Sequence, residues 1–130
     1  MARTSPIRML FIAGVSAAVG LLSLPARASA APGHAADLNT ITGAAAAAQQ
    51  RFGVPASLLE AICYLEGQLS DHGGAPSVAG GYGCMNLARN NHVDTLDQAA
   101  KLLAVSASAV RSSQWLDIAG AAAEIQRCRA

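Results

Sequence analysis

Glu66 is the residue whose type and position most clearly suggest chemistry. It is the one charged residue in the apolar stretch A-I-C-Y-L-E-G-Q-L, residues 61–69. On a helix with about 100° per residue it shares a face with Leu59 and Ile62, whereas Glu60 points to the opposite, polar side. A carboxyl group on an apolar face is expected to have a raised pKa and to keep its proton toward neutral pH. Such a group can act as a general acid, and in glycoside chemistry it protonates the glycosidic oxygen.

The apolar face around Glu66 also permits a purely structural interpretation. Its predicted members are Leu58, Leu59, Ile62, Leu65 and Leu69. A glutamate on such a face can instead be satisfied by a buried arginine or by backbone amides. The helical pattern alone leaves both interpretations open.

Residues 1–30 have the features of a secretory signal peptide. Two arginines introduce an apolar stretch over residues 9–24, and Ala28, Ser29 and Ala30 form a small-residue cleavage site. A membrane anchor would need about 18 to 20 unbroken apolar residues, and glycines and serines interrupt this stretch. We therefore expect a secreted protein with a mobile tail over residues 31–36 and no stable membrane insertion after cleavage.

Removal of the signal peptide changes the length and the charge of the chain. The mature chain would have 130 − 30 = 100 residues, the size of one small domain. The loss of Arg3, Arg8 and Arg27 lowers the basic residues from 9 to 6 against 8 acidic ones, so the formal net charge changes from +1 to −2. This balance argues against a protein that binds nucleic acid or anionic membranes.

Three cysteines remain in the mature chain, Cys63, Cys84 and Cys128. Because the number is odd, at most one intramolecular disulfide can form. A bridge from Cys84 is favoured since it would attach a long loop to a helix, and either Cys63 or Cys128 could be its partner. A zinc site with His72 or His92 is the alternative, but no C-x-x-C or H-x-x-x-H spacing supports a metal site.

The spacing of apolar residues predicts an all-α domain over residues 37–130. A first helix is expected from Leu38 to Phe52, with Gly53 as its C-terminal stop. A second helix is expected to begin at Pro55 and to end near Leu69.

Two further helices are predicted in the second half of the chain. Thr95 to Gln98 read as a capping box, in which Thr95 caps a third helix and Gln98 reaches back to it. After a short turn at residues 106–111, the last helix carries Trp115, Ile118, Ala122 and Ile125 on one side. No segment has the alternation typical of a β-strand.

Residues 70–94 form a long connection that is rich in glycine. Long ordered loops within a small domain often form functional surfaces. Tyr82, Cys84, Met85 and Leu87 are residue types that favour burial. The second half of the loop is therefore expected to fold back onto the helices.

Three motifs occur in order along the chain: L-L-E-A-I-C-Y-L-E-G, then G-G-Y-G-C-M-N-L, then D-I-A-G-A-A-A-E-I. Together they resemble the lysozyme-like lytic transglycosylase family, which has a helix ending in E-S, a G-x-M-Q turn and a later N-I-x-x-G helix. The resemblance covers about residues 37–126. It is greatest to the module ahead of the catalytic domain in some secreted actinobacterial N-acetylmuramoyl-L-alanine amidases.

The resemblance implies a small lysozyme-like helical domain in which Glu66 is the catalytic acid. Met85 and Asn86 would form the turn that lines the glycan cleft, and the helix of Asp117 would close it. Tyr82 is a further candidate for substrate binding, since an aromatic ring can stack on a sugar. The implied reaction cleaves the β-1,4 bond between N-acetylmuramic acid and N-acetylglucosamine in peptidoglycan, and it needs no metal or cofactor.

The chain departs from the family pattern at three of these positions. Gly67 stands where the family has serine, Asn86 where it has glutamine and Asp117 where it has asparagine. The sequence also stops before the family's A-Y-N segment, so the domain is expected to be shorter at its C-terminal end. Two functions therefore stay open: a lytic enzyme, or a non-catalytic wall-binding module or N-terminal fragment of an amidase. Either would be extracellular or associated with the cell wall, with peptidoglycan glycan strands as its partner.

Overall fold

The computed structural model describes residues 35–129. The predicted signal peptide and most of the predicted tail lie outside these residues. The described elements are α1 (Ile41–Phe52), α2 (Ala56–Gly67), the short 3-10 helix η1 (His72–Gly74), β1 (Gly81–Tyr82), β2 (Leu87–Ala88), α3 (Thr95–Leu103), α4 (Ala107–Arg111) and α5 (Gln114–Arg129). The prediction of a mainly helical domain is confirmed. None of the helices described is both long and apolar enough to cross a membrane.

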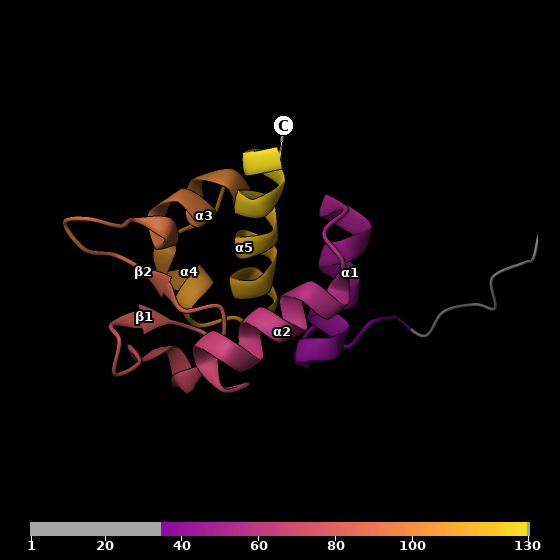
Figure 1. Cartoon of the computed structure of the whole chain (residues 1–130), viewed down its shortest axis with the longest axis horizontal. Coiled ribbons are helices and arrows are strands. Elements are labelled where there is room, and N and C mark those ends of the chain that lie inside the picture. Colours follow the sequence, from indigo (N-terminus) through magenta and orange to yellow (C-terminus); the bar gives the residue numbers. More distant parts are fainter. Residues whose placement is uncertain (1–34, 130) are drawn as a thin grey trace, which may run out of the picture. The chain divides into compact units, whose positions relative to one another are not determined.

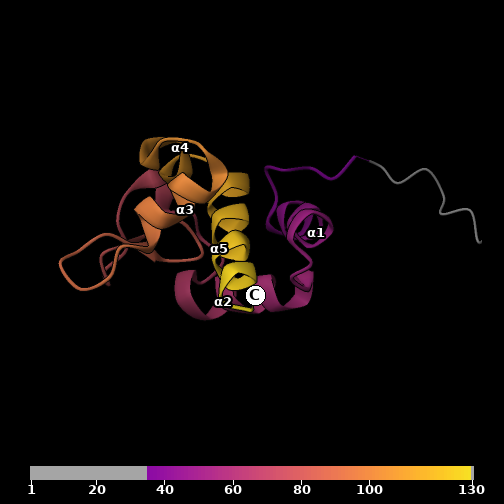
Figure 2. The same cartoon turned by 90° about the horizontal axis from the view of Figure 1, so that it is seen from above.

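The helices gather around α5. Figures 1 and 2 show it between α1 on one side and α3 and α4 on the other, and it packs against all three. Gly120 lies where a Cβ atom would come within 2.7 Å of the Ala99 Cβ atom, so glycine permits the close approach of α3. The predicted apolar side of the last helix is confirmed, with Ile118 and Ala122 buried and Trp115 and Ile125 half-buried against the core.

The ends of α1 show how the local sequence sets a helix. The helix begins at Ile41 rather than at Leu38, because Thr40 caps it: the Thr40 Oγ1 atom accepts a hydrogen bond from the Gly43 amide at 3.1 Å. Gly53 ends the helix with a φ of 68°, a left-handed conformation that glycine adopts without steric cost. The predicted C-terminal stop is confirmed.

The buried face of α2 agrees with the predicted one only in part, at Leu59 and at the half-buried Ile62. Leu59, Cys63 and Gly67 are buried, whereas three leucines of the predicted apolar arc are exposed. These are Leu58, Leu65 and Leu69, with exposed fractions of 44%, 75% and 50%. The leucine pattern misplaced the centre of this face, because the close contact of another segment at Gly67 left no signal in that pattern.

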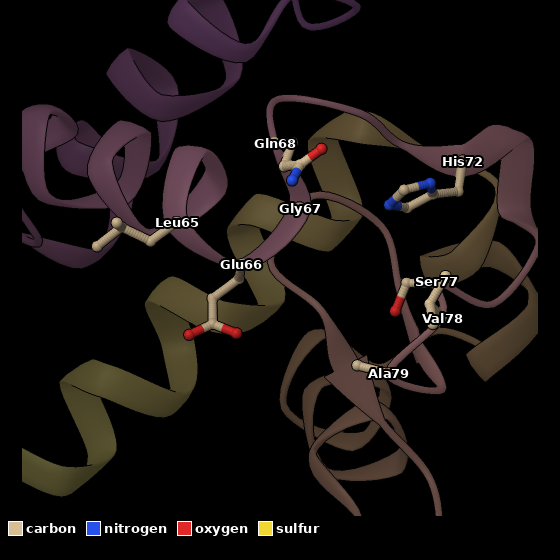
Figure 3. Close-up of a pocket in the computed structure, with 8 residues that line it drawn as sticks. All are labelled: Leu65, Glu66, Gly67, Gln68, His72, Ser77, Val78 and Ala79. Atoms are coloured by element: carbon tan, nitrogen blue, oxygen red, sulfur yellow. The ribbon is translucent and has the colours of Figure 1, made fainter.

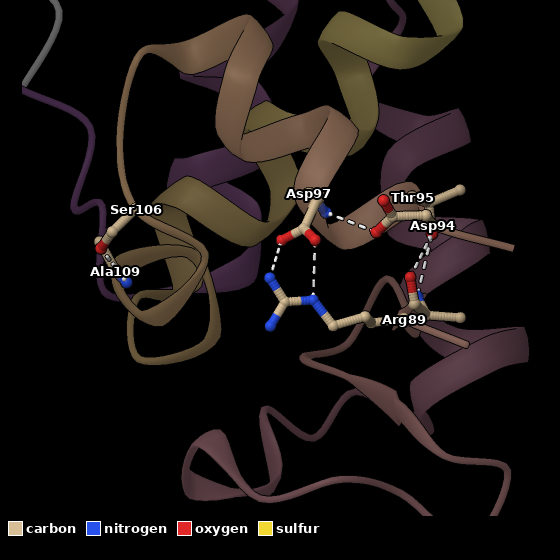
Figure 4. Close-up of polar contacts among 7 residues, drawn as sticks. Arg89, Asp94, Thr95, Asp97, Ser106 and Ala109 are labelled. Atoms are coloured by element: carbon tan, nitrogen blue, oxygen red, sulfur yellow. Dashed lines mark hydrogen bonds and ion pairs between the residues drawn. The ribbon is translucent and has the colours of Figure 1, made fainter. Parts of the chain in front are cut away.

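The N-terminus of α3 corrects the predicted capping box by one residue. Asp94, not Thr95, is the cap, and its carboxylate accepts a hydrogen bond from the Asp97 amide at 3.3 Å (Figure 4). The Thr95 hydroxyl instead accepts a hydrogen bond from the Ala88 amide of β2 at 2.9 Å. Arg89 forms an ion pair with Asp97, which lowers the pKa of the Asp97 carboxyl. The interactions with Ala88 and Arg89 attach the loop to α3.

A small antiparallel sheet lies within the loop between α2 and α3, where no strand was predicted. Gly81 pairs with Ala88 and Tyr82 with Leu87. Strands of two residues are too short to show the alternation by which a strand is recognised in a sequence. The prediction that this half of the loop folds back is confirmed, because Cys84, Met85 and Leu87 are buried in the core.

Candidate functional site

Glu66 lies in the last turn of α2 and is exposed to solvent. The expectation that it points into an apolar environment is wrong, because the core-facing side of α2 is formed by Leu59, Cys63 and Gly67. Its Oε2 atom accepts a hydrogen bond from the Asn86 Nδ2 atom at 3.4 Å. Glu60, expected to be fully solvated, is half-buried.

Glu66 borders a cavity of about 240 Å³ at the C-terminal end of α2 (Figure 3). Residues of α2, of η1 and of the segment before β1 line it: Leu65, Glu66, Gly67, Gln68, His72, Ser77, Val78 and Ala79. The wall therefore combines a carboxylate, an amide, an imidazole and a hydroxyl with apolar side chains. Its volume is below the range of about 300 to 1,000 Å³ that is typical of sites enclosing a whole small ligand. It can hold a part of a larger molecule.

The turn from Gly83 to Asn86 brings an amide to Glu66. The Asn86 amide N–H donates to the Gly83 carbonyl oxygen at 3.2 Å, and Asn86 has a φ of 53°, which asparagine tolerates better than most residues. The Ser77 hydroxyl donates to Asn86 Oδ1 at 2.9 Å. Asn86 is thus held between Ser77 and Glu66, two residues that line the cavity.

The disulfide Cys63–Cys84 joins this turn to α2. The predicted bridge from Cys84 is confirmed, and its partner is the cysteine of the second helix, while Cys128 is free and exposed. Both bridged cysteines are fully buried. The pairing also removes two of the thiols that the alternative zinc site would have used, and residues 35–129 contain no cluster of three potential metal ligands.

Asp117 is buried, with 2% of its surface exposed, and it does not line the cavity. Its Oδ2 atom accepts a hydrogen bond from the Met85 amide at 3.0 Å, and its Oδ1 atom has no partner. Burial raises the pKa of Asp117 to about 7, against the opposing effect of the Met85 and Cys84 amides. The Asp117 carboxyl, which was expected on the helix that closes the glycan cleft, thus contacts the turn at Met85 and is not exposed at the cavity.

Two other predicted binding residues also differ from their expected placement. The Met85 side chain belongs to the core, with 6% exposed. Tyr82 is half-buried, with the Arg111 guanidinium 5.0 Å from the centre of its ring. Of the predicted site residues, Glu66 lines the cavity and Asn86 contacts it through a hydrogen bond, whereas Tyr82, Met85 and Asp117 are not among the lining residues.

The site also contains residues that the sequence did not single out. Ser77 and Gln68 line the cavity, and so does His72, which the sequence suggested only as a possible zinc ligand. Ser77 meets Asn86 through the fold of the loop, and no spacing in the sequence indicates that contact. His92 is exposed and is not among the residues that line the cavity.

Gly67 is required where it stands. A Cβ atom there would lie 2.5 Å from both the Cα and the carbonyl oxygen of Cys84, which is backbone that cannot move aside as a side chain can. The glycine in place of the family's serine therefore has a steric reason. It allows the Cys84 turn to contact α2 directly.

We expect Gly67→Ser to lower the free energy of unfolding by about 2 kcal/mol, because overpacking forces backbone apart. Urea unfolding followed by circular dichroism measures the change. Ala61→Ser, an exposed position of the same helix, is the matched control and should change stability by less than about 0.5 kcal/mol. Equal stability of Gly67→Ser and the parent would show that the close contact is absent in solution.

Comparison of the chain with protein-family models, with curated proteins and with solved structures finds no match.

Proposed function

We propose that this protein is a secreted, lysozyme-like module directed at peptidoglycan and that it binds the glycan strand at the cavity beside Glu66. The observation that carries the proposal is the hydrogen bond between Asn86 and Glu66. It joins the end of the helix motif to the turn motif, the two segments whose sequences resemble the lysozyme-like transglycosylases. The polar groups of the cavity suit sugar hydroxyl and N-acetyl groups, and Leu65 and Val78 offer apolar contacts.

Secretion is supported by two features of the chain. Residues 1–30 have the pattern of a signal peptide, and a buried disulfide is typical of proteins in oxidising compartments. The proposed location is therefore extracellular or at the cell wall. The proposed partner is the glycan strand of peptidoglycan.

Cleavage of the strand is the second candidate function, and it is favoured by the presence of the Glu66 carboxyl group at the cavity. In this mechanism Glu66 protonates the oxygen between N-acetylmuramic acid and N-acetylglucosamine as the bond breaks. The carboxylate then removes the proton of the muramyl 6-hydroxyl while that oxygen attacks C1, which gives the 1,6-anhydro product. Binding without cleavage is the better supported function, because the exposed Glu66 lacks the apolar surroundings that are typical of a general acid.

The test is incubation of the purified protein with isolated peptidoglycan, compared with Glu66→Gln. We expect the parent to sediment with the wall and the variant to bind about fivefold more weakly, since one charged hydrogen-bond acceptor is lost. Glu60→Gln, on the same helix but outside this cavity, should bind like the parent.

Mass analysis of the soluble products separates the two candidates. Anhydro-muropeptides from the parent and not from Glu66→Gln would establish cleavage. If no soluble products appeared and the protein did not sediment with the wall, both functions would be contradicted. Freed stem peptides would indicate amidase chemistry instead.

A further inference from the structure

Asp117 is the buried ionisable group that the proposed binding site does not use. It lies in the first turn of α5, and its Oδ2 atom holds the Met85 amide. Gly83 lies directly against the carboxylate, where any Cβ atom would overlap it. The turn is therefore packed onto this one side chain.

The contact at Asp117 is the start of a chain of contacts that ends at the cavity. The Met85 amide is followed by Asn86, whose side chain donates to Glu66 and accepts from Ser77. The disulfide holds Cys84, the residue before Met85, to α2. Asp117 is therefore one of the restraints on Asn86, together with the Tyr82–Leu87 strand pairing and the hydrogen bond from the Asn86 amide to the Gly83 carbonyl oxygen.

We propose that Asp117 is a positioning residue, which holds the Gly83–Asn86 turn so that Asn86 meets Glu66, and that its proton makes glycan binding depend on pH. This inference rests on the function proposed above. Asp117 touches no ligand and acts only through the turn. The ligand is the same β-1,4-linked amino-sugar strand.

The surroundings of Asp117 favour its neutral form. Its Oδ1 atom is buried without a partner, and burial disfavours a charge there. The elements and loops around the turn carry ionisable groups that include Asp71 and His72 near η1, Tyr82 on β1, Arg111 on α4 and Glu66 on α2. Asp71 is the one whose charge acts on the Asp117 carboxyl, and it also raises its pKa. Arg111 is over the Tyr82 ring, and His72 and Glu66 line the cavity.

The direction of the pH effect follows from these pKa values. In the packed turn the pKa of Asp117 is about 7, raised from 3.8, and a carboxyl that becomes hydrated when the turn opens returns to its ordinary value. The packed turn therefore binds the proton more tightly than the open one. Opening is favoured as the pH rises from about 4 to 7 and changes little above about 8.

The first measurement follows the turn itself by NMR and needs no glycan. We expect the amide resonances of Met85 and Asn86 to shift with pH, with a midpoint near 7. Asp117→Asn keeps the shape and an acceptor for the Met85 amide but cannot titrate, so the shift should vanish. Asp37→Asn, an exposed carboxyl before α1, is the matched control and should keep it. Absence of the titration in the parent protein would overturn the inference, even if Asp117→Asn failed to fold.

The second measurement is the affinity for a hexamer of β-1,4-linked N-acetylglucosamine between pH 5 and pH 8. The parent and Asp37→Asn should lose about threefold or more in affinity over this range, because part of the population opens. Asp117→Asn should lose less affinity over this range than the parent. An identical pH profile in Asp117→Asn and the parent would overturn the inference while the proposed function stands. No binding at any pH, with the amide titration intact, would instead contradict the proposed function.

Discussion

The free energy of unfolding should fall by about 4 kcal/mol between pH 4 and pH 8 because of Asp117 alone, and Asp117→Asn should remove this loss. The pKa of this carboxyl rises from 3.8 in the unfolded chain to about 7 in the fold, and each pKa unit corresponds to about 1.4 kcal/mol. Between these two pKa values the folded protein binds more protons than the unfolded chain. Stability therefore decreases as the pH rises through this range.

Urea unfolding at pH 4.5, 6, 7 and 8.5 measures the effect as the difference between the parent and Asp117→Asn. At pH 8.5 the variant should be about 2 kcal/mol more stable than the parent. This is less than the full loss caused by Asp117, because the N–H groups of the buried amide have no hydrogen-bond partners. At pH 4.5 it should have no advantage. A constant difference across the four pH values would show that the Asp117 carboxyl has an ordinary pKa in the fold.

Removal of the Cys63–Cys84 disulfide is the second large effect, and it should cost about 3 kcal/mol. The bridge closes a loop between cysteines 21 positions apart, and the cross-link limits the freedom of the unfolded chain over that length. The double variant Cys63→Ala, Cys84→Ala also leaves space in the core, because both sulfur atoms are fully buried.

Thermal unfolding of this double variant, of the parent and of Cys128→Ser gives the comparison. Cys128 is free and exposed, so its substitution should leave the melting temperature unchanged. A reducing agent should lower the melting temperature of the parent and of Cys128→Ser, but not that of the double variant. If Cys128→Ser were the destabilised protein, the bridge in solution would involve Cys128.

The two effects concern the same short turn, which Asp117 holds from α5 and the disulfide holds from α2. These two attachments order the long loop of a mainly helical domain that has few large side chains in its core. The proposed glycan site lies at the end of the turn, where Asn86 meets Glu66. Stability of the turn and geometry of the site are therefore linked.

Several features could be predicted because they depend on residues that are close in the sequence. Gly53 ends α1 through its own backbone freedom, and the apolar stripe of α5 follows from the helical repeat. The α3 cap was predicted one residue late, because Thr95 has the right type for a cap but is engaged by Ala88. A competing contact from another segment decided that position.

The sequence by itself determined a mainly helical chain, the return of the loop through its apolar residues, and the limit of one disulfide among three cysteines. Only the tertiary structure decided that Cys63 is the partner, that Glu66 is exposed and that Asp117 is buried. Each of these depends on which face of α2 meets the turn. That face is selected by close backbone contact at Gly67, and such a contact between distant segments leaves no periodic pattern in the sequence.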